Sequence, residues 1–188
     1  NNNKIIINQI NQLTALITLS ERELSRILRV WKQTLIPPII TASLYILIFG
    51  YSLGDKINLG TGQDYMSFIF PGLLLMSVIT SAYSNSSFSL FINKFHKSIR
   101  ELLASPMTYL SINMGYTIGS LFRAGIIAIG VFLVGLFLAG VTIQHTSLAI
   151  LILFITIILF SQFGILTAIW AQDFDQIKSG NFVTKVIY

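Results

Sequence analysis

Long apolar runs separated by short polar segments organise this chain. Residues 34–54, 65–93 and 124–172 contain no Lys, Arg, Asp or Glu. A helix rises about 1.5 Å per residue, so about 20 apolar residues cross a hydrocarbon core of about 30 Å. The third run is long enough for two crossings, and Gln144 to Ser147 provides a polar break within it. The pattern predicts an all-α polytopic membrane protein with four spans, at about 34–54, 65–93, 110–141 and 148–170.

The segment before the first span has the pattern of an amphipathic helix. Ser20 and Glu23 have the spacing of a capping box, which predicts a helix start at Ser20. One face of this helix would carry Leu24, Ile27, Leu28, Trp31 and Leu35. The opposite, polar face would carry Arg22, Arg26, Arg29 and Gln33. We expect residues 1–33 to form an N-terminal cytoplasmic segment with an interfacial helix anchored by Trp31, followed by a transmembrane domain over 34–188.

A second amphipathic segment, Lys94 to Pro106, lies between the second and third spans. At the helical step of 100° its apolar residues fall within an arc of roughly 120°. The rest of the circle is polar, and Pro106 is expected to end the helix because Ser105 precedes a proline. Two interpretations remain open from the pattern alone: a surface that docks a partner, or a helix that only lies on the membrane.

The second half of the second span is unusually polar for a membrane helix. The candidate residues there are Thr80, Tyr83, Ser84, Asn85 and Ser87. They either line a polar path or make hydrogen bonds between helices. In the third span Gly115 and Gly119 have the spacing that allows close helix packing.

Charge is scarce and asymmetric along the chain. Charged residues make up 10% of the 188 residues and hydrophobic residues 54%. Of the 12 Lys and Arg residues, only Lys56 falls on the second side of the predicted topology. Basic loops face the cytoplasm, so we expect a cytoplasmic N-terminus and a cytoplasmic 94–106 segment. The net charge of +5 then reflects topology and not binding to nucleic acid.

The spans contain little that could carry chemistry. They hold no carboxylate, which argues against a transporter driven by protons or sodium ions. The chain has no phosphate-binding loop, no cysteine and no nucleophile–base set, so we expect no enzymatic activity and no bound metal or cofactor. Arg123 is expected to lie at the cytoplasmic boundary and to extend its guanidinium towards water. An energy source would have to come from another chain.

At this point the sequence resembles the permease subunits of type-2 ATP-binding cassette exporters. The resemblance is carried by Trp31 to Pro38 (WKQTLIPP), Tyr65 to Gly72 (YMSFIFPG) and Arg100 to Pro106 (RELLASP), and extends from about Arg22 to the end. It implies that the 94–106 segment is a coupling helix that docks on a separate ATPase subunit, which binds the ATP. The coupling residues would be Lys94, Phe95, Lys97, Arg100, Glu101, Leu102, Ser105 and Pro106.

The resemblance also implies an interface helix that contacts the ATPase, with Arg22, Arg26, Arg29 and Trp31 as its candidate residues. Family members have six spans and work as dimers in the bacterial inner membrane. We therefore expect a piece of a longer exporter of drug, lipid-linked or polysaccharide-type cargo, holding four spans. The alternative is a membrane scaffold that binds anionic lipid and transports nothing.

Overall fold

A computed structural model of the chain describes residues 2–53, 65–95, 108–140 and 146–171. The described residues form helices and no strand: α1 (Asn2–Arg29), α2 (Trp31–Thr34), α3 (Ile36–Leu53), α4 (Tyr65–Phe95), α6 (Tyr109–Ala139) and α7 (Thr146–Trp170). Four stretches are long and apolar enough to cross a membrane: Trp31–Phe49, Tyr65–Phe95, Tyr109–Leu138 and Thr146–Trp170. The prediction of a polytopic helical membrane protein with four spans is confirmed.

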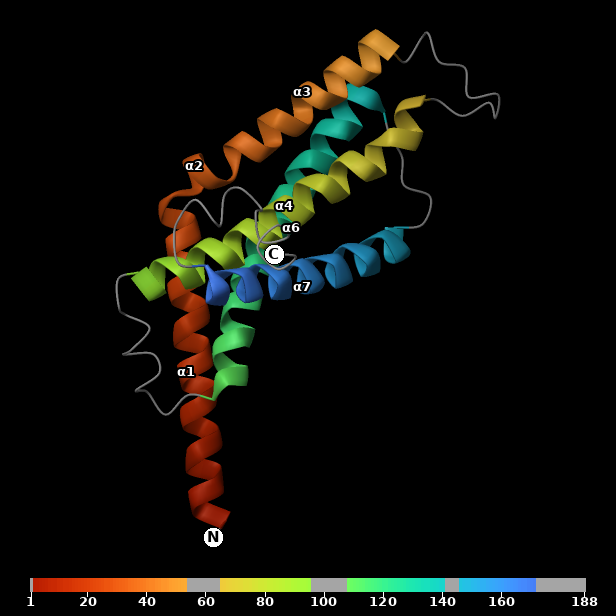
Figure 1. Cartoon of the computed structure of the whole chain (residues 1–188). Helices are drawn as coiled ribbons and strands as arrows, with labels where there is room; N and C mark the ends of the chain where they lie inside the picture. The colour runs from red at the N-terminus through yellow and green to blue at the C-terminus, as the bar shows by residue number, and fades with distance from the viewer. Residues whose placement is uncertain (1, 54–64, 96–107, 141–145, 172–188) are drawn as a thin grey trace, which may run out of the picture.

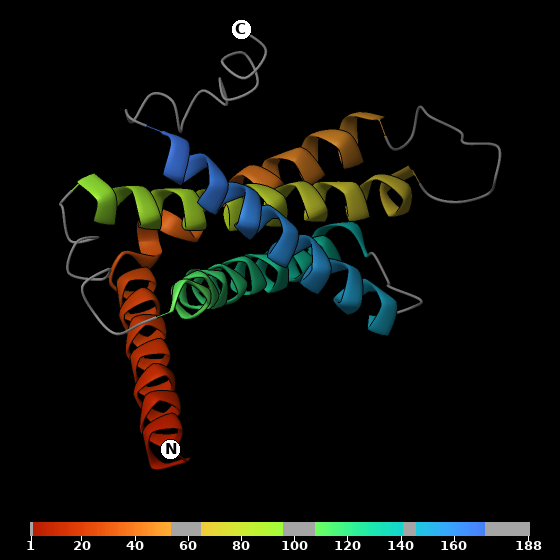
Figure 2. The ribbon, with the colours of Figure 1, turned by 60° about the horizontal axis from the view of Figure 1, so that its bottom comes forward.

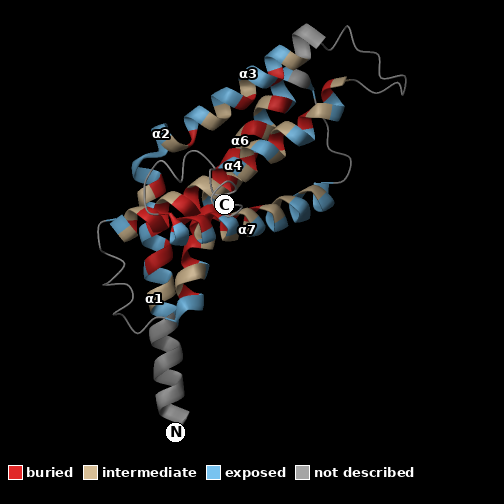
Figure 3. Ribbon diagram, viewed as in Figure 1, coloured by how far each residue is buried: buried red, intermediate tan, exposed pale blue. Residues whose placement is uncertain are grey.

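Helix α4 is the centre of the bundle. It contacts α3, α6 and α7, while α1 packs mainly on α6 (Figure 1). Figure 2 shows α7 crossing both α4 and α6. The ends of α4 and α7 meet, and α1 lies beside the start of α6 (Figure 1). The buried residues gather in this region, where α1, α4, α6 and α7 converge (Figure 3).

The outer faces of the spans are apolar, and the buried side of α4 is polar in its second half. Exposed side chains on α3 and α7 include Ile40, Leu44, Ile48, Ile150, Leu151 and Phe154. Buried side chains of α4 include Ser81, Asn85, Ser86, Ser87, Ser89 and Asn93. Lipid chains solvate the apolar faces as well as another helix would, so small and polar residues are what hold membrane helices together.

Helix α1 begins well before the predicted start. The capping box at Ser20 is wrong: Ser20 lies inside α1, is buried, and donates its hydroxyl hydrogen to the carbonyl of Leu16 at 2.8 Å. A serine inside a helix bonds to the carbonyl four residues earlier in this way when the preceding turn is already helical. Residues 20–35 do not form the one helix that the apolar pattern had indicated. Helix α1 ends at Arg29, and the short α2 separates it from α3.

The two glycines of the third span form the contact with α1. A Cβ at Gly115 would lie 2.5 Å from Leu19 Cδ2, and one at Gly119 would lie 3.1 Å from Glu23 Cβ. Leu19 and Glu23 are four residues apart, as are the glycines, so one turn of α1 lies along one turn of α6. The predicted close packing is confirmed, with α1 as the partner.

Candidate functional site

An ion pair between the buried Glu23 and the partly exposed Arg26 lies where α1 meets the polar half of α4. Glu23 is 2% exposed and accepts hydrogen bonds at Oε2 from Arg26 Nη2 (2.8 Å) and from Ser89 Oγ (2.7 Å). Arg26 Nη2 also donates to Asn85 Oδ1 at 3.3 Å. An ionised carboxylate that leaves water is stabilised only by such paired and charge-assisted bonds. Through Ser89 and Asn85, this ion pair of α1 is attached to α4.

A second contact repeats this link one turn further along α4. Arg22 Nη2 donates to Asn93 Oδ1 at 3.2 Å, and Asn93 Nδ2 donates to the hydroxyl of Tyr116 at 2.8 Å. Tyr116 is among the most buried side chains of α6. One asparagine thus joins α1, α4 and α6.

Hydroxyl groups continue the network towards α7. Asn85 Nδ2 donates to Ser120 Oγ at 3.2 Å, and Ser86 Oγ lies 2.6 Å from Ser120 Oγ and 2.8 Å from Ser161 Oγ. These serines are on α4, α6 and α7 and are all buried. We call the whole set the polar seam; its residues are Arg22, Glu23, Arg26, Asn85, Ser86, Ser89, Asn93, Tyr116, Ser120 and Ser161.

The two predicted faces are each divided: Ile27 and Leu35 of the apolar face are buried, while Arg22 of the polar face is exposed although it contacts α4. Arg22 and Arg26 bond to α4, whereas Leu28 and Trp31 are exposed. These two arginines were predicted on the polar face of the helix, and the structure adds hydrogen bonds from them to asparagines of α4. Arg29 is exposed as expected, and the Lys32 ammonium lies 5.9 Å from the centre of the Trp31 ring, as suits a pair at a membrane interface.

The polar half of α4 serves two purposes, which divide by helix face. Asn85 and Ser87 are both buried; Asn85 makes a hydrogen bond between helices, to Ser120, whereas Ser87 donates to the carbonyl of Ser84 within α4. Thr80 and Ser84 line a groove between α3 and α4, and Tyr83 is partly buried. The groove is lined by Pro37, Pro38, Thr41, Ala42, Tyr45, Leu73, Met76, Ser77, Thr80, Ser81, Ser84 and Arg123.

Arg123 contacts the segment that leads into the first span. It is partly buried, and its Nη2 donates to the carbonyl of Thr34 at the end of α2, at 3.3 Å. This contact joins α6 to the start of the first span, and the extension of the guanidinium to the membrane boundary stays a prediction. Its Nε is buried without a hydrogen-bond partner.

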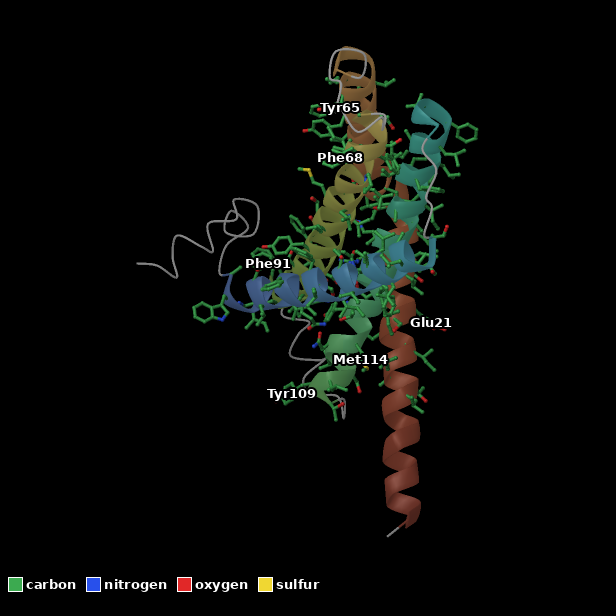
Figure 4. All side chains as sticks on the ribbon, turned by 90° about the vertical axis from the view of Figure 1, so that its right-hand side faces the viewer. Glu21, Tyr65, Phe68, Phe91, Tyr109 and Met114 are labelled. Atoms are coloured by element: carbon green, nitrogen blue, oxygen red, sulfur yellow. The ribbon has the colours of Figure 1, made fainter. Side chains whose placement is uncertain are left out.

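Lys94 binds the end of α7. Its Nζ donates to the carbonyl of Ile169 at 2.9 Å and to that of Ala171 at 2.8 Å. The last carbonyls of a helix have no partner within the helix and carry partial negative charge, so an ammonium satisfies them. Phe91, labelled beside α7 in Figure 4, packs in the same cluster with Ala168 and Ala171. The ends of α4 and α7 are thereby joined.

We predict that Lys94→Met lowers the free energy of unfolding of the full-length protein by about 1–2 kcal/mol, because two charge-assisted hydrogen bonds are lost. Detergent titration in mixed micelles measures it. Lys32→Met is the matched control, since Lys32 is exposed. Equal stability of the Lys94 and Lys32 variants would show that the cap contributes nothing.

The remaining coupling candidates lie outside the described residues. These are Lys97, Arg100, Glu101, Leu102, Ser105 and Pro106. Lys94 and Phe95 are described: Phe95 is exposed, and its ring stacks on that of Phe91 at 6.4 Å. The docking role of all eight residues stays a prediction.

Sequence comparison gives the family of this helical bundle. The family model described as ABC-2 type transporter matches residues 14–186. The chain belongs to the ABC-2 type transporter family. The match includes the part of α1 that contributes to the polar seam, all four spans and the connection between α4 and α6.

Named relatives of this ABC-2 chain are membrane permeases. The chain is 40% identical over 164 residues to the inner membrane transport permease YadH of Escherichia coli (strain K12), and equally to YadH of Shigella flexneri. The alignment covers 87% of this chain and 64% of each relative, so the chain spans somewhat less than two thirds of their length. No solved structure matches it.

Proposed function

We propose that this chain is part of the permease subunit of an ATP-binding cassette exporter in the bacterial inner membrane. A separate ATPase subunit binds and hydrolyses the ATP, and the permease moves cargo outward. Family membership over residues 14–186 and four membrane-spanning helices support the proposal. The relatives' printed name, inner membrane transport permease, supports the location. A second permease copy completes the assembly.

The observation that carries the proposal is the set of contacts around the α4–α6 connection. This connection follows Phe95 and precedes Thr108, the N-cap of α6. Lys94, next to it, binds the carbonyls at the end of α7. A force applied to residues 96–107 would therefore act on α4 and α6 through the chain and on α7 through Lys94.

The polar seam extends that linkage to α1. Arg22 and Arg26 bond to Asn93 and Asn85 of α4, so α1 moves with the same end of the bundle. Packed helices with satisfied polar contacts shift as units and do not deform continuously. A docked ATPase dimer that closes on ATP would thus move α1, α4, α6 and α7 together and open a path on the outer side.

Orientation follows from the basic residues. Arg22, Arg26 and Lys94 lie at one end of the bundle through their contacts with α4 and α7. Cytoplasmic ends of spans carry the excess of Lys and Arg, so this end and the N-terminus are proposed to be cytoplasmic.

We predict that Arg100→Glu and Glu101→Lys each weaken binding of the full-length protein to its ATPase by about tenfold or more. Charge reversal places like charges against the partner, and about 1.4 kcal/mol corresponds to a factor of ten. Co-purification with the ATPase encoded beside the permease gene, and stimulation of its ATP hydrolysis, measure it.

Lys56→Glu is the matched control for charge reversal, because Lys56 lies in the connection between α3 and α4 on the opposite side of the proposed topology. It should leave binding unchanged. If both reversals in the 96–107 connection leave assembly and stimulation intact, this connection does not couple the two subunits.

A further inference from the structure

The groove between α3 and α4 is lined by two residues that each have one buried polar atom without a hydrogen-bond partner. It has a volume of about 350 Å³ and is open on one side. Ser81 is 2% exposed, and its hydroxyl lacks a hydrogen-bond partner. The buried Nε of Arg123 lacks one as well. Each buried donor left unsatisfied costs about 1–3 kcal/mol, more for a charged group, so their placement in one groove indicates a missing acceptor.

The neighbours of Ser81 show that its free hydroxyl is not the rule for this helix. Ser77 donates to the carbonyl of Leu73 at 3.0 Å, and Thr80 donates to that of Met76 at 2.8 Å. Both satisfy their hydrogens within α4 and offer only lone pairs to the groove. Among the lining side chains, the buried donors without a partner are the Ser81 hydroxyl and Nε of Arg123.

The charge of the groove is positive. Arg123 is the only Lys, Arg, Asp or Glu among its lining residues. Among the described residues the one salt bridge is that of Glu23 with Arg26, so no described carboxylate neutralises Arg123. A guanidinium presents a planar set of donors that matches phosphate and carboxylate oxygens. An anion that only accepts hydrogen bonds would satisfy both unpaired donors and would also neutralise the charge of Arg123. A water molecule could accept the hydrogen bonds but would not neutralise that charge.

The walls of the groove are apolar and open towards the outer face of the helices. Leu73 and Ala42 form part of the inner wall, and the lining residues Tyr45 and Met76 are exposed. The outer face of α3 and α4 carries exposed apolar side chains suited to lipid, such as Leu44 and Phe68. A ligand that enters the groove from this apolar face would need an apolar tail beside its charged head.

We propose that this groove binds the anionic head group, phosphate or carboxylate, of an amphiphilic cargo, with Arg123 and Ser81 holding the head and the α3–α4 walls holding the tail. Its volume suits a head group with the first part of a chain, since small-ligand pockets measure about 300–1,000 Å³. As a cargo site the inference rests on the proposed function; as a binding site it stands alone.

The test is binding of short-chain phosphatidic acid to the full-length protein in detergent micelles, by isothermal titration calorimetry. We expect diacylglycerol of the same chain length and inorganic phosphate each to bind at least about tenfold more weakly, because one lacks the charge and the other the tail. Arg123→Gln should weaken phosphatidic acid binding at least about tenfold and Ser81→Ala several-fold, with Arg123→Lys between wild type and Arg123→Gln.

Arg29→Gln is the matched control, since Arg29 is exposed and does not line the groove. It should bind like the wild type. Equal affinity for the neutral lipid, or an unchanged affinity in both Arg123→Gln and Ser81→Ala, overturns the site. Inorganic phosphate that binds as tightly as phosphatidic acid overturns the amphiphile. Ser81→Ala keeps the test decisive if Arg123→Gln fails to fold, because it removes no bond made by the protein.

ATP hydrolysis by the assembled complex separates cargo from structural lipid. An amphiphile that binds through Arg123 and stimulates hydrolysis supports a cargo site, whereas one that binds without stimulation overturns the cargo role and leaves a lipid site. Failure of the proposed function appears differently, as loss of ATPase co-purification while phosphatidic acid binding persists.

Discussion

Replacing Arg26 by Gln is expected to lower the free energy of unfolding of the full-length protein by about 2–4 kcal/mol. The substitution leaves the carboxylate of Glu23 at 2% exposure with Ser89 as its only remaining described hydrogen-bond donor. Removing one partner of a buried ion pair costs about 3–5 kcal/mol. The lower range applies here because the Arg26 side chain is 35% exposed and water screens part of the interaction.

A double-variant cycle separates the pair from its surroundings. Glu23→Gln removes the buried charge, so we expect it to cost about 1–2 kcal/mol, close to a neutral hydrogen bond. The double variant with Arg26→Gln should then be more stable than Arg26→Gln alone, because no carboxylate is left unpaired. Glu21→Gln is the control, since Glu21, labelled in Figure 4, is exposed on the same helix.

Unfolding in mixed detergent micelles measures all four proteins. If the double variant is destabilised relative to the wild type by the sum of the two single effects, Glu23 and Arg26 act independently. ATPase stimulation by the same variants reports whether the attachment of α1 to α4 also transmits movement.

The apolar pattern was sufficient to predict the spans, because a bilayer allows few structures other than helices of about 20 apolar residues. It was not sufficient to orient α1. The pattern of Arg22 and Arg26 against Leu28 and Trp31 indicates an amphipathic helix, but not which face meets the bundle. In the structure both kinds of side chain contact the bundle: Ile27 is 2% exposed, and Arg22 and Arg26 donate hydrogen bonds to α4.

The candidate residues of α4 were located by composition, but their roles depend on helical phase. Asn85 faces α6, while Thr80 and Ser84 face the groove. A single sequence does not show which neighbour each face receives. Glu23 was missed as a buried residue for the same reason. Gly119 lacks a side chain and so makes room for Glu23, but only the structure shows that these two residues meet.

Lys94 was predicted to take part in docking, which stays a prediction, and the structure adds a contact within the bundle. Its position in an amphipathic pattern indicates a charged surface, and the resemblance implies contact with an ATPase. Its hydrogen bonds to Ile169 and Ala171 join residues 75 and 77 positions apart, which no local pattern shows. Arg100 and Glu101 remain the sharper tests of docking.

Gly164→Ala is expected to cost about 1–3 kcal/mol of unfolding free energy, by overpacking the contact between α4 and α7. A Cβ at Gly164 would lie 2.6 Å from the backbone oxygen of Tyr83 and 3.0 Å from Ser86 Cβ. Backbone atoms cannot rotate away, so α7 must move as a whole. That movement would lengthen the 2.8 Å contact between Ser86 and Ser161.

Two other glycines give a graded comparison under the same measurement. Gly125→Ala should cost nothing, because no atom lies within 4 Å of its added methyl group. Gly115→Ala should fall between, since its methyl group meets the end of the flexible Leu19 side chain at 2.5 Å. A Gly164→Ala protein as stable as Gly125→Ala would contradict the close approach of α4 and α7. If Gly164→Ala instead uncouples ATP hydrolysis from cargo movement while ATPase binding is retained, α7 carries the motion that Lys94 passes to it.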